Sequence, residues 1–190
     1  SSDFVVKSSQ NDKDIIFKGV DNSSLITALT LDMSAAGNAI FNNDVTVCND
    51  INLLSDGAVI YFGADKDVQA FHVHNSGLTL RNNSTGDDTP FLLTLQTGET
   101  DIAASDVLGK IQFQAPDEGT GTDAILIAAA IQAVSEGDFS SSANATRLEF
   151  MTGASEAAAT KMTLTSAGNV GIGTNAPESD SILELEQGSP

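Results

Sequence analysis

The chain has 190 residues, 26 of them acidic and 8 basic, with a formal net charge of −18 at pH 7. This charge argues strongly against nucleic-acid binding, which needs a basic surface, and it disfavours docking on anionic lipid. No apolar run approaches the roughly 20 residues of a membrane-spanning helix, so membrane insertion is not expected. The balance suits a protein that stays soluble in the salt outside a cell.

Apolar residues make up 41% of the chain, but there is no Trp, one Tyr and nine Phe, and small and polar residues dominate. Such a composition favours many turns and thin layers, and it predicts an elongated all-β architecture. A single chain of this kind buries little surface, so association with identical chains is expected to supply the rest. The one cysteine, Cys48, is expected to be a small buried or half-buried side chain.

Period-two alternation predicts short strands in the N-terminal part, separated by polar turns. They are expected over residues 4–7, 14–18, 25–31, 39–41, 45–47, 51–54, 58–62, 68–74 and 78–81. Strands this short, with turns this frequent, favour a β-helix-like or β-prism-like stack. We therefore predict short-strand shaft modules over residues 1–81 and a hinge over the polar run 82–90.

Residues 91–177 are expected to form a β-rich distal domain with longer strands, followed by a C-terminal tail over 178–190. Ile111 and Phe113 share one face of a strand over 107–115. The Ala-rich run 124–134 permits a helix but is short for one, so a strand is preferred. A strand over 147–151 is expected to turn Leu148 and Phe150 inward. The start of the tail alternates and fits either a further strand or a helical neck.

The residue pattern over 161–177 predicts a strand, a tight turn and a second strand. Met162 and Leu164 point to one side and Thr163 to the other, while Gly168 tolerates the positive φ of the turn. The segment MTLTSAGNVGI resembles LTLDMSAAGNAIF earlier in the chain. The two copies indicate a repeated module of strand, glycine corner and strand. Chance repetition in a low-diversity sequence is the alternative.

The segment MTLTSAGNVGIGTNAP, together with DIIFKG, ITALTLDMSAAGNAIF, INLLSDGAVIYFGADKDVQAFHVHNSGLTL and SDVLGKIQFQAPDEGTGTDAILIAAAIQAV, covers nearly the whole chain. In this order they resemble tail fibres of marine bacteriophages, in the region upstream of an endosialidase-type intramolecular chaperone. The resemblance implies a homotrimeric fibre at the virion tail, outside the cell. Its partners would be its own copies, other virion tail proteins, and a host surface glycan or protein.

The chain begins with Ser1 rather than Met, which indicates a processed or incomplete product. No chaperone domain follows Pro190, so the tail over 178–190 is expected to lead toward a chaperone that is missing or was removed. The exposed polar loops over 116–123 and 135–146 are the expected contacts with a host surface.

No enzyme activity is expected, because the sequence lacks a phosphate-binding glycine loop and a His-Glu-x-x-His motif. Two alternatives stay open. A tailspike-type polysaccharide depolymerase would use paired carboxylates, and the chain offers Asp87 with Asp88, Asp117 with Glu118, and Glu136 with Asp138. Sugar subsites usually add aromatic faces, however, and only Tyr61 and phenylalanines are present. The other alternative is a cell-surface adhesin or extracellular filament subunit.

No cofactor is expected, with one exception at His72 and His74. Residues i and i+2 of a strand share a face, here with Val68 and Ala70. Three chains around a threefold axis would bring six imidazoles together, enough for an octahedral transition-metal ion. Some long tail fibres bind iron at histidine pairs of this spacing, and this pair looks similar. Two exposed or hydrogen-bonded surface histidines are the alternative.

Overall fold

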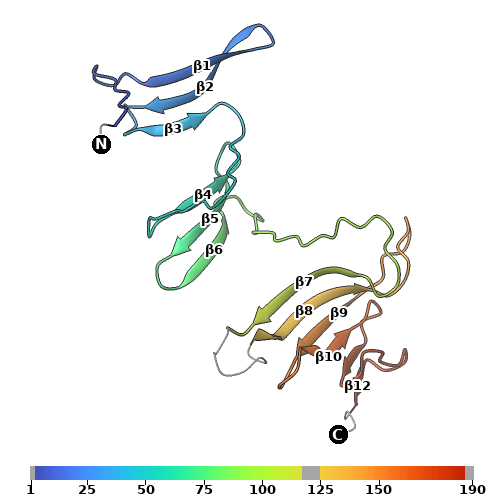
Figure 1. Cartoon of the computed structure of the whole chain (residues 1–190). Coiled ribbons are helices and arrows are strands. Elements are labelled where there is room, and N and C mark those ends of the chain that lie inside the picture. Colours follow the sequence, from blue (N-terminus) through green and yellow to red (C-terminus); the bar gives the residue numbers. More distant parts are fainter. Residues whose placement is uncertain (1–2, 117–124, 187–190) are drawn as a thin grey trace. The chain divides into compact units, whose positions relative to one another are not determined.

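The computed structural model describes residues 3–116 and 125–186. These residues form twelve strands in three open sheets and no helix, so the predicted all-β class is confirmed (Figure 1). The chain divides between Thr89 and Pro90 into two compact units, which are described separately.

The first unit holds two three-stranded antiparallel sheets. The first sheet consists of β1 (Ile15–Asp21), β2 (Ser24–Asp32) and β3 (Asn38–Phe41), in that order. The second sheet consists of β4 (Val59–Phe62), β5 (Val68–Val73) and β6 (Gly77–Asn82), again in chain order. Each is a simple meander, because short turns join antiparallel neighbours.

Three predicted strands of this unit are wrong: residues 4–7, 45–47 and 51–54 lie outside any strand. Their alternating apolar pattern is genuine, but a strand also needs a neighbour to complete its hydrogen-bond ladder. None of these segments pairs with a strand of the described chain. Their apolar side chains, such as Phe4, Val45 and Ile51, consequently stay exposed.

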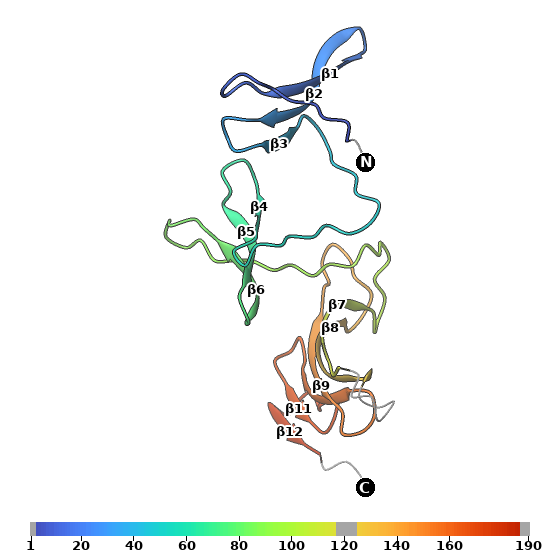
Figure 2. The same ribbon diagram turned by 60° about the vertical axis from the view of Figure 1, so that its left-hand side comes forward.

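The second unit holds one six-stranded sheet in the order β12-β11-β10-β9-β8-β7. Its strands are β7 (Val107–Gln114), β8 (Ile127–Ser135), β9 (Thr146–Thr152), β10 (Ala159–Leu164), β11 (Val170–Ile172) and β12 (Leu183–Leu185). All neighbours are antiparallel except β11 and β12, which run parallel at one edge (Figure 2). The preference for a strand in the Ala-rich run is confirmed by β8, and the start of the tail forms the strand β12 rather than a helix.

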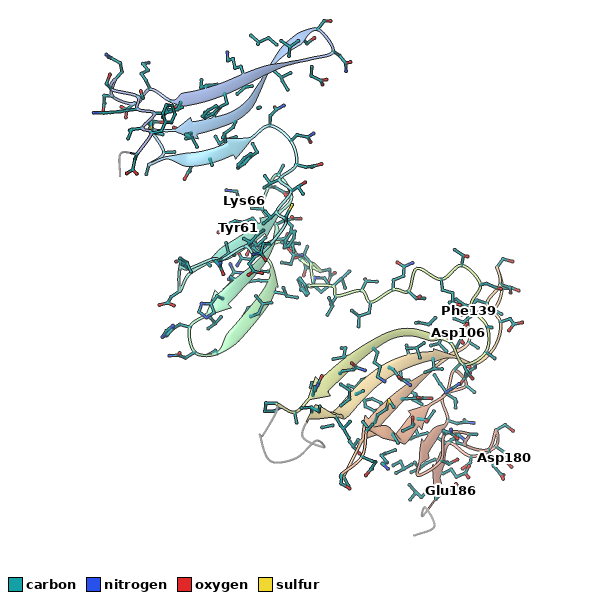
Figure 3. All side chains as sticks on the ribbon, in the orientation of Figure 1. Tyr61, Lys66, Asp106, Phe139, Asp180 and Glu186 are labelled. Carbon is teal, nitrogen blue, oxygen red and sulfur yellow. The ribbon has the colours of Figure 1, made fainter. Side chains whose placement is uncertain are left out.

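Backbone hydrogen bonds hold the segment before β7 at the C-terminal end of β8. The Ser135 amide donates to the Asp106 carbonyl at 2.9 Å, and the Ser105 amide donates to the Ser135 carbonyl at 3.0 Å. The Phe139 amide donates to the Ile102 carbonyl at 2.9 Å, so the loop after β8 is held at the same corner. Figure 3 labels Asp106 and Phe139 there.

Both copies of the repeated sequence fold as the predicted hairpin. In the first, β2 pairs with β3 from Asp32 opposite Asn38, and in the second, β10 pairs with β11 from Leu164 opposite Val170. Gly37 and Gly168 both have a φ of 89° in the connecting turns. A side chain is disfavoured in this left-handed region, which explains the glycine in each copy.

We expect Gly173→Ala to destabilise the protein more than Gly168→Ala. Both glycines have positive φ, so alanine at either position costs about 1–2 kcal/mol of backbone strain. At Gly168 an added Cβ meets nothing within 4 Å, whereas at Gly173 it overlaps the Glu186 carbonyl oxygen. That overlap opposes the Glu186 amide donating to the Ile172 carbonyl at 2.9 Å, which helps to hold β12. Thermal unfolding followed by circular dichroism measures the midpoint of each variant. Equal midpoints would contradict the close packing of Gly173 on Glu186.

Candidate functional site

One face of the six-stranded sheet carries a continuous row of large apolar side chains, which we call the apolar ladder. Its members are register partners on six consecutive strands: Ile111, Ile131, Phe150, Met162, Ile172 and Leu185. Side chains two residues along a strand share its face, so a second apolar row runs beside the ladder. That row consists of Ala133, Leu148, Leu164, Val170 and Leu183.

The described part of the chain leaves most of the ladder uncovered. Ile111 is 44% exposed, Phe150 38% and Ile172 43%. Leu95 packs closely on Gly109, which faces the same side, and with Leu93 it walls a hollow at the β7 edge of the sheet. An apolar surface this continuous is unusual on a monomeric protein.

The opposite face carries small and polar side chains, and it contains most of the sheet's deeply buried residues. Its central row consists of Lys110, Gln132, Glu149, Thr163, Gly171 and Glu184. Thr163 has no exposed surface and Glu149 is 5% exposed. The loop after β11 contributes to this burial, because Thr174 and Pro177 lie directly over Gly171.

This arrangement corrects one prediction. Leu148 and Phe150 were expected to point inward, but in the single chain they lie on the uncovered face, and Glu149 between them is the buried residue. The alternation along β9 was predicted correctly, but the face that was expected to be buried is the exposed one in the single chain. The physical reason is steric: the small residues Gly171 and Thr163 let a loop of the same chain approach their face closely.

Glu149 is the centre of a buried polar network. Its Oε1 accepts from the Arg147 Nε at 2.7 Å, and its Oε2 accepts from Gln132 Nε2 at 2.7 Å and from Thr160 Oγ1 at 3.0 Å. Burial raises the pKa of Glu149, but the hydrogen bonds from Arg147, Gln132 and Thr160 outweigh it and the net pKa is lowered. Opposite charges at i and i+2 of a strand, here Arg147 and Glu149, are the sequence signal that could have predicted this network.

The two smaller sheets also have uncovered apolar side chains. On the β4–β6 sheet, Ile60 and Leu80 flank Ala70 in register, and both are exposed. On the β1–β3 sheet, Phe17 and Phe41 flank Leu29 in the same way and are also exposed. Uncovered apolar surface is therefore a property of all three sheets.

The predicted histidine pair lies at the end of β5. The His72 and His74 ring centroids are 6.3 Å apart. His72 Nδ1 lies 3.1 Å from the Asp56 carbonyl oxygen, and His74 Nδ1 lies 3.3 Å from Asp56 Oδ1. Within residues 3–116 and 125–186, no group of three or more His, Cys, Asp or Glu side chains is placed to hold a metal ion. A metal here would need ligands from further chains and stays a prediction.

Of the other predicted site residues, Asp87 and Asp88 belong to the first compact unit, and Glu136 and Asp138 belong to the second. Asp117, Glu118 and most of the loop 116–123 lie outside the described residues. Glu136 accepts a hydrogen bond from the Ser166 amide at 3.2 Å, and therefore braces the turn between β10 and β11. Tyr61 is half exposed, with the Lys66 ammonium 5.2 Å from its ring centroid (Figure 3). Cys48 is exposed, so its expected burial is wrong.

Comparison with known proteins adds no family to this description. No family model matches the chain, and no curated protein matches it. Across the part of the chain that the structure describes, no helix has the length and apolar character needed to cross a bilayer.

We expect the Glu149 network to make stability fall in acid. A carboxyl whose pKa is lowered on folding contributes fully above its unfolded value, 4.5, and the contribution is lost as pH falls through the lower folded value. Glu149→Gln should lower stability at pH 7 by about 1–3 kcal/mol and flatten the profile below pH 4.5. Unfolding midpoints between pH 7 and 3 measure this. Glu99→Gln, at an exposed carboxylate, is the control and should leave the profile unchanged.

The histidine prediction is tested by elemental analysis of purified protein at its native oligomeric state. If six imidazoles converge on one ion, about one transition-metal ion per three chains is expected, and His72→Ala with His74→Ala should remove it. A content below about 0.1 ion per three chains, after incubation with ferrous, nickel or zinc ions and desalting, would eliminate the site.

Proposed function

We propose that this chain is a structural and adhesive segment of a viral tail fibre, in which three identical copies form a rod that presents loops to a host surface. The proposal rests on the resemblance of its motifs and on one physical observation. That observation is the large apolar surface that all three sheets leave uncovered.

The exposed area supports association. The chain exposes 14555 Å². Two separate compact units, each of half its mass, would expose about 10,300 Å² together. The excess, about 4,000 Å², is of the size that permanent protein assemblies bury, roughly 2,000–5,000 Å². A partner that covers this excess would bury surface that a compact chain of this mass would bury by itself.

The distribution of the apolar surface favours identical copies as partners. Uncovered apolar residues occur on the β1–β3, β4–β6 and β7–β12 sheets alike. A partner that satisfies all of them must extend along the whole chain, as another copy does. The unpaired segments 45–47 and 51–54 retain a strand pattern, and they fit pairing with a neighbouring copy.

The attachment role is assigned to the loop after β8, with the expected loop 116–123 as its companion. The loop between Ser135 and Thr146 is anchored by the Phe139 amide and by an isolated bridge between Ser140 and Ala143. Its small polar tip is exposed, which suits adaptable contacts with a glycan or protein. The net charge of −18 fits work in extracellular salt at the virion tail and argues against nucleic acid as a partner.

Light scattering during size-exclusion chromatography tests the assembly. At micromolar concentration and physiological salt we expect one species of about 59 kDa, three times the chain mass of 19.6 kDa. A monomer that unfolds cooperatively at micromolar concentration would contradict the proposal. A continuous series of larger species would instead indicate an extracellular filament subunit, because open-ended contacts do not close at three.

A further inference from the structure

We propose that the uncovered side of the six-stranded sheet, which carries the apolar ladder and which we call the ladder face, is the surface through which copies of this chain pack together. This inference rests on the proposed function, because it names the contact that holds the assembly. It is also separable from it, because the same face can instead close a dimer.

The ladder face lacks charge, which suits contact between like-charged copies. Chains that each carry −18 repel one another, so a stable contact between them needs a surface without acidic groups. The ladder and the neighbouring row contain no ionisable side chain. Lys110 on β7, Arg147 and Glu149 on β9, and Glu184 on β12 belong to the opposite face, while Lys161 lies at the register shift of β10, outside both apolar rows.

The size and shape of the ladder face fit a second copy. Six strands span about 24 Å across the ladder at the usual spacing of about 4.8 Å. Around a threefold axis three such faces turn inward, so the apolar rows of each copy meet the apolar rows of its two neighbours.

Within residues 3–116 and 125–186, the chain's own segments do not supply this cover. Leu93 and Leu95 reach the face at the β7 edge, and residues 103–106 are bound at the end of β8. Ile131, Phe150 and Ile172 stay more than a third exposed. The vacant part of the face therefore extends from Ile111 on β7, which is 44% exposed, over the middle strands to the β12 edge.

Thiol labelling tests the contact with matched neighbours. In a Cys48→Ser background, which leaves no other thiol, Ile111→Cys and Gln112→Cys place a cysteine on opposite faces of β7. Both positions are exposed in the single chain. In the full-length assembly we expect maleimide to label the Ile111→Cys variant at least about tenfold more slowly than the Gln112→Cys variant, because access requires opening of the contact. The two rates should become equal in guanidinium chloride.

A second pair of cysteine variants tests the β12 edge of the sheet. It keeps the test valid if a variant of the first pair misfolds. Leu185→Cys lies on the ladder in β12, and Glu186→Cys beside it does not. Circular dichroism and the elution volume show whether each variant keeps the native assembly. Equal labelling within both pairs, in variants that assemble normally, would overturn the inference.

The outcomes separate the two proposals. A trimer whose ladder-face cysteines react as fast as their neighbours would leave the fibre proposal standing and reject this contact. Protected ladder-face cysteines in a dimer would support the contact and reject the trimer. A monomer with freely reactive cysteines at all four positions would reject both.

Discussion

The structure depends on one asymmetry: the six-stranded sheet buries its small and polar face and leaves its large apolar face open. A loop of the same chain lies on the buried side at Gly171, because glycine lets backbone approach there. The bulky side of the sheet offers no such access. Phe150 and its neighbours on the apolar ladder need a broad complementary surface, and segments of this chain reach only its edge.

The energetics of the proposed contact link folding to association. Burying one large apolar side chain contributes about 1.5–3 kcal/mol, and the ladder residues other than Leu185 are already more than half covered, so completing their burial contributes about 1 kcal/mol each. Summed over both apolar rows, this approaches the 5–15 kcal/mol that stabilises a typical domain. The measured stability of this protein should therefore depend on its concentration.

The buried network around Glu149 gives the sheet its register. A slip of β9 by one residue would place Glu149 on the open face and Phe150 among the small side chains around Thr163. The hydrogen bonds from Arg147 and Gln132 would be lost in the same step. A polar centre of this kind contributes specificity, while the apolar ladder contributes the stabilising surface.

Local patterns determined much of this protein. Alternation predicted β2, β5, β7 and β9, and glycine chemistry predicted the two hairpins that turn at Gly37 and Gly168, because both depend on neighbouring residues. The tertiary structure decided which segments find a partner, so residues 45–47 form no strand despite their pattern. It also decided which face is buried. Alternation defines two faces, but only the loops that reach the sheet determine that Thr163, and not Phe150, lies inside.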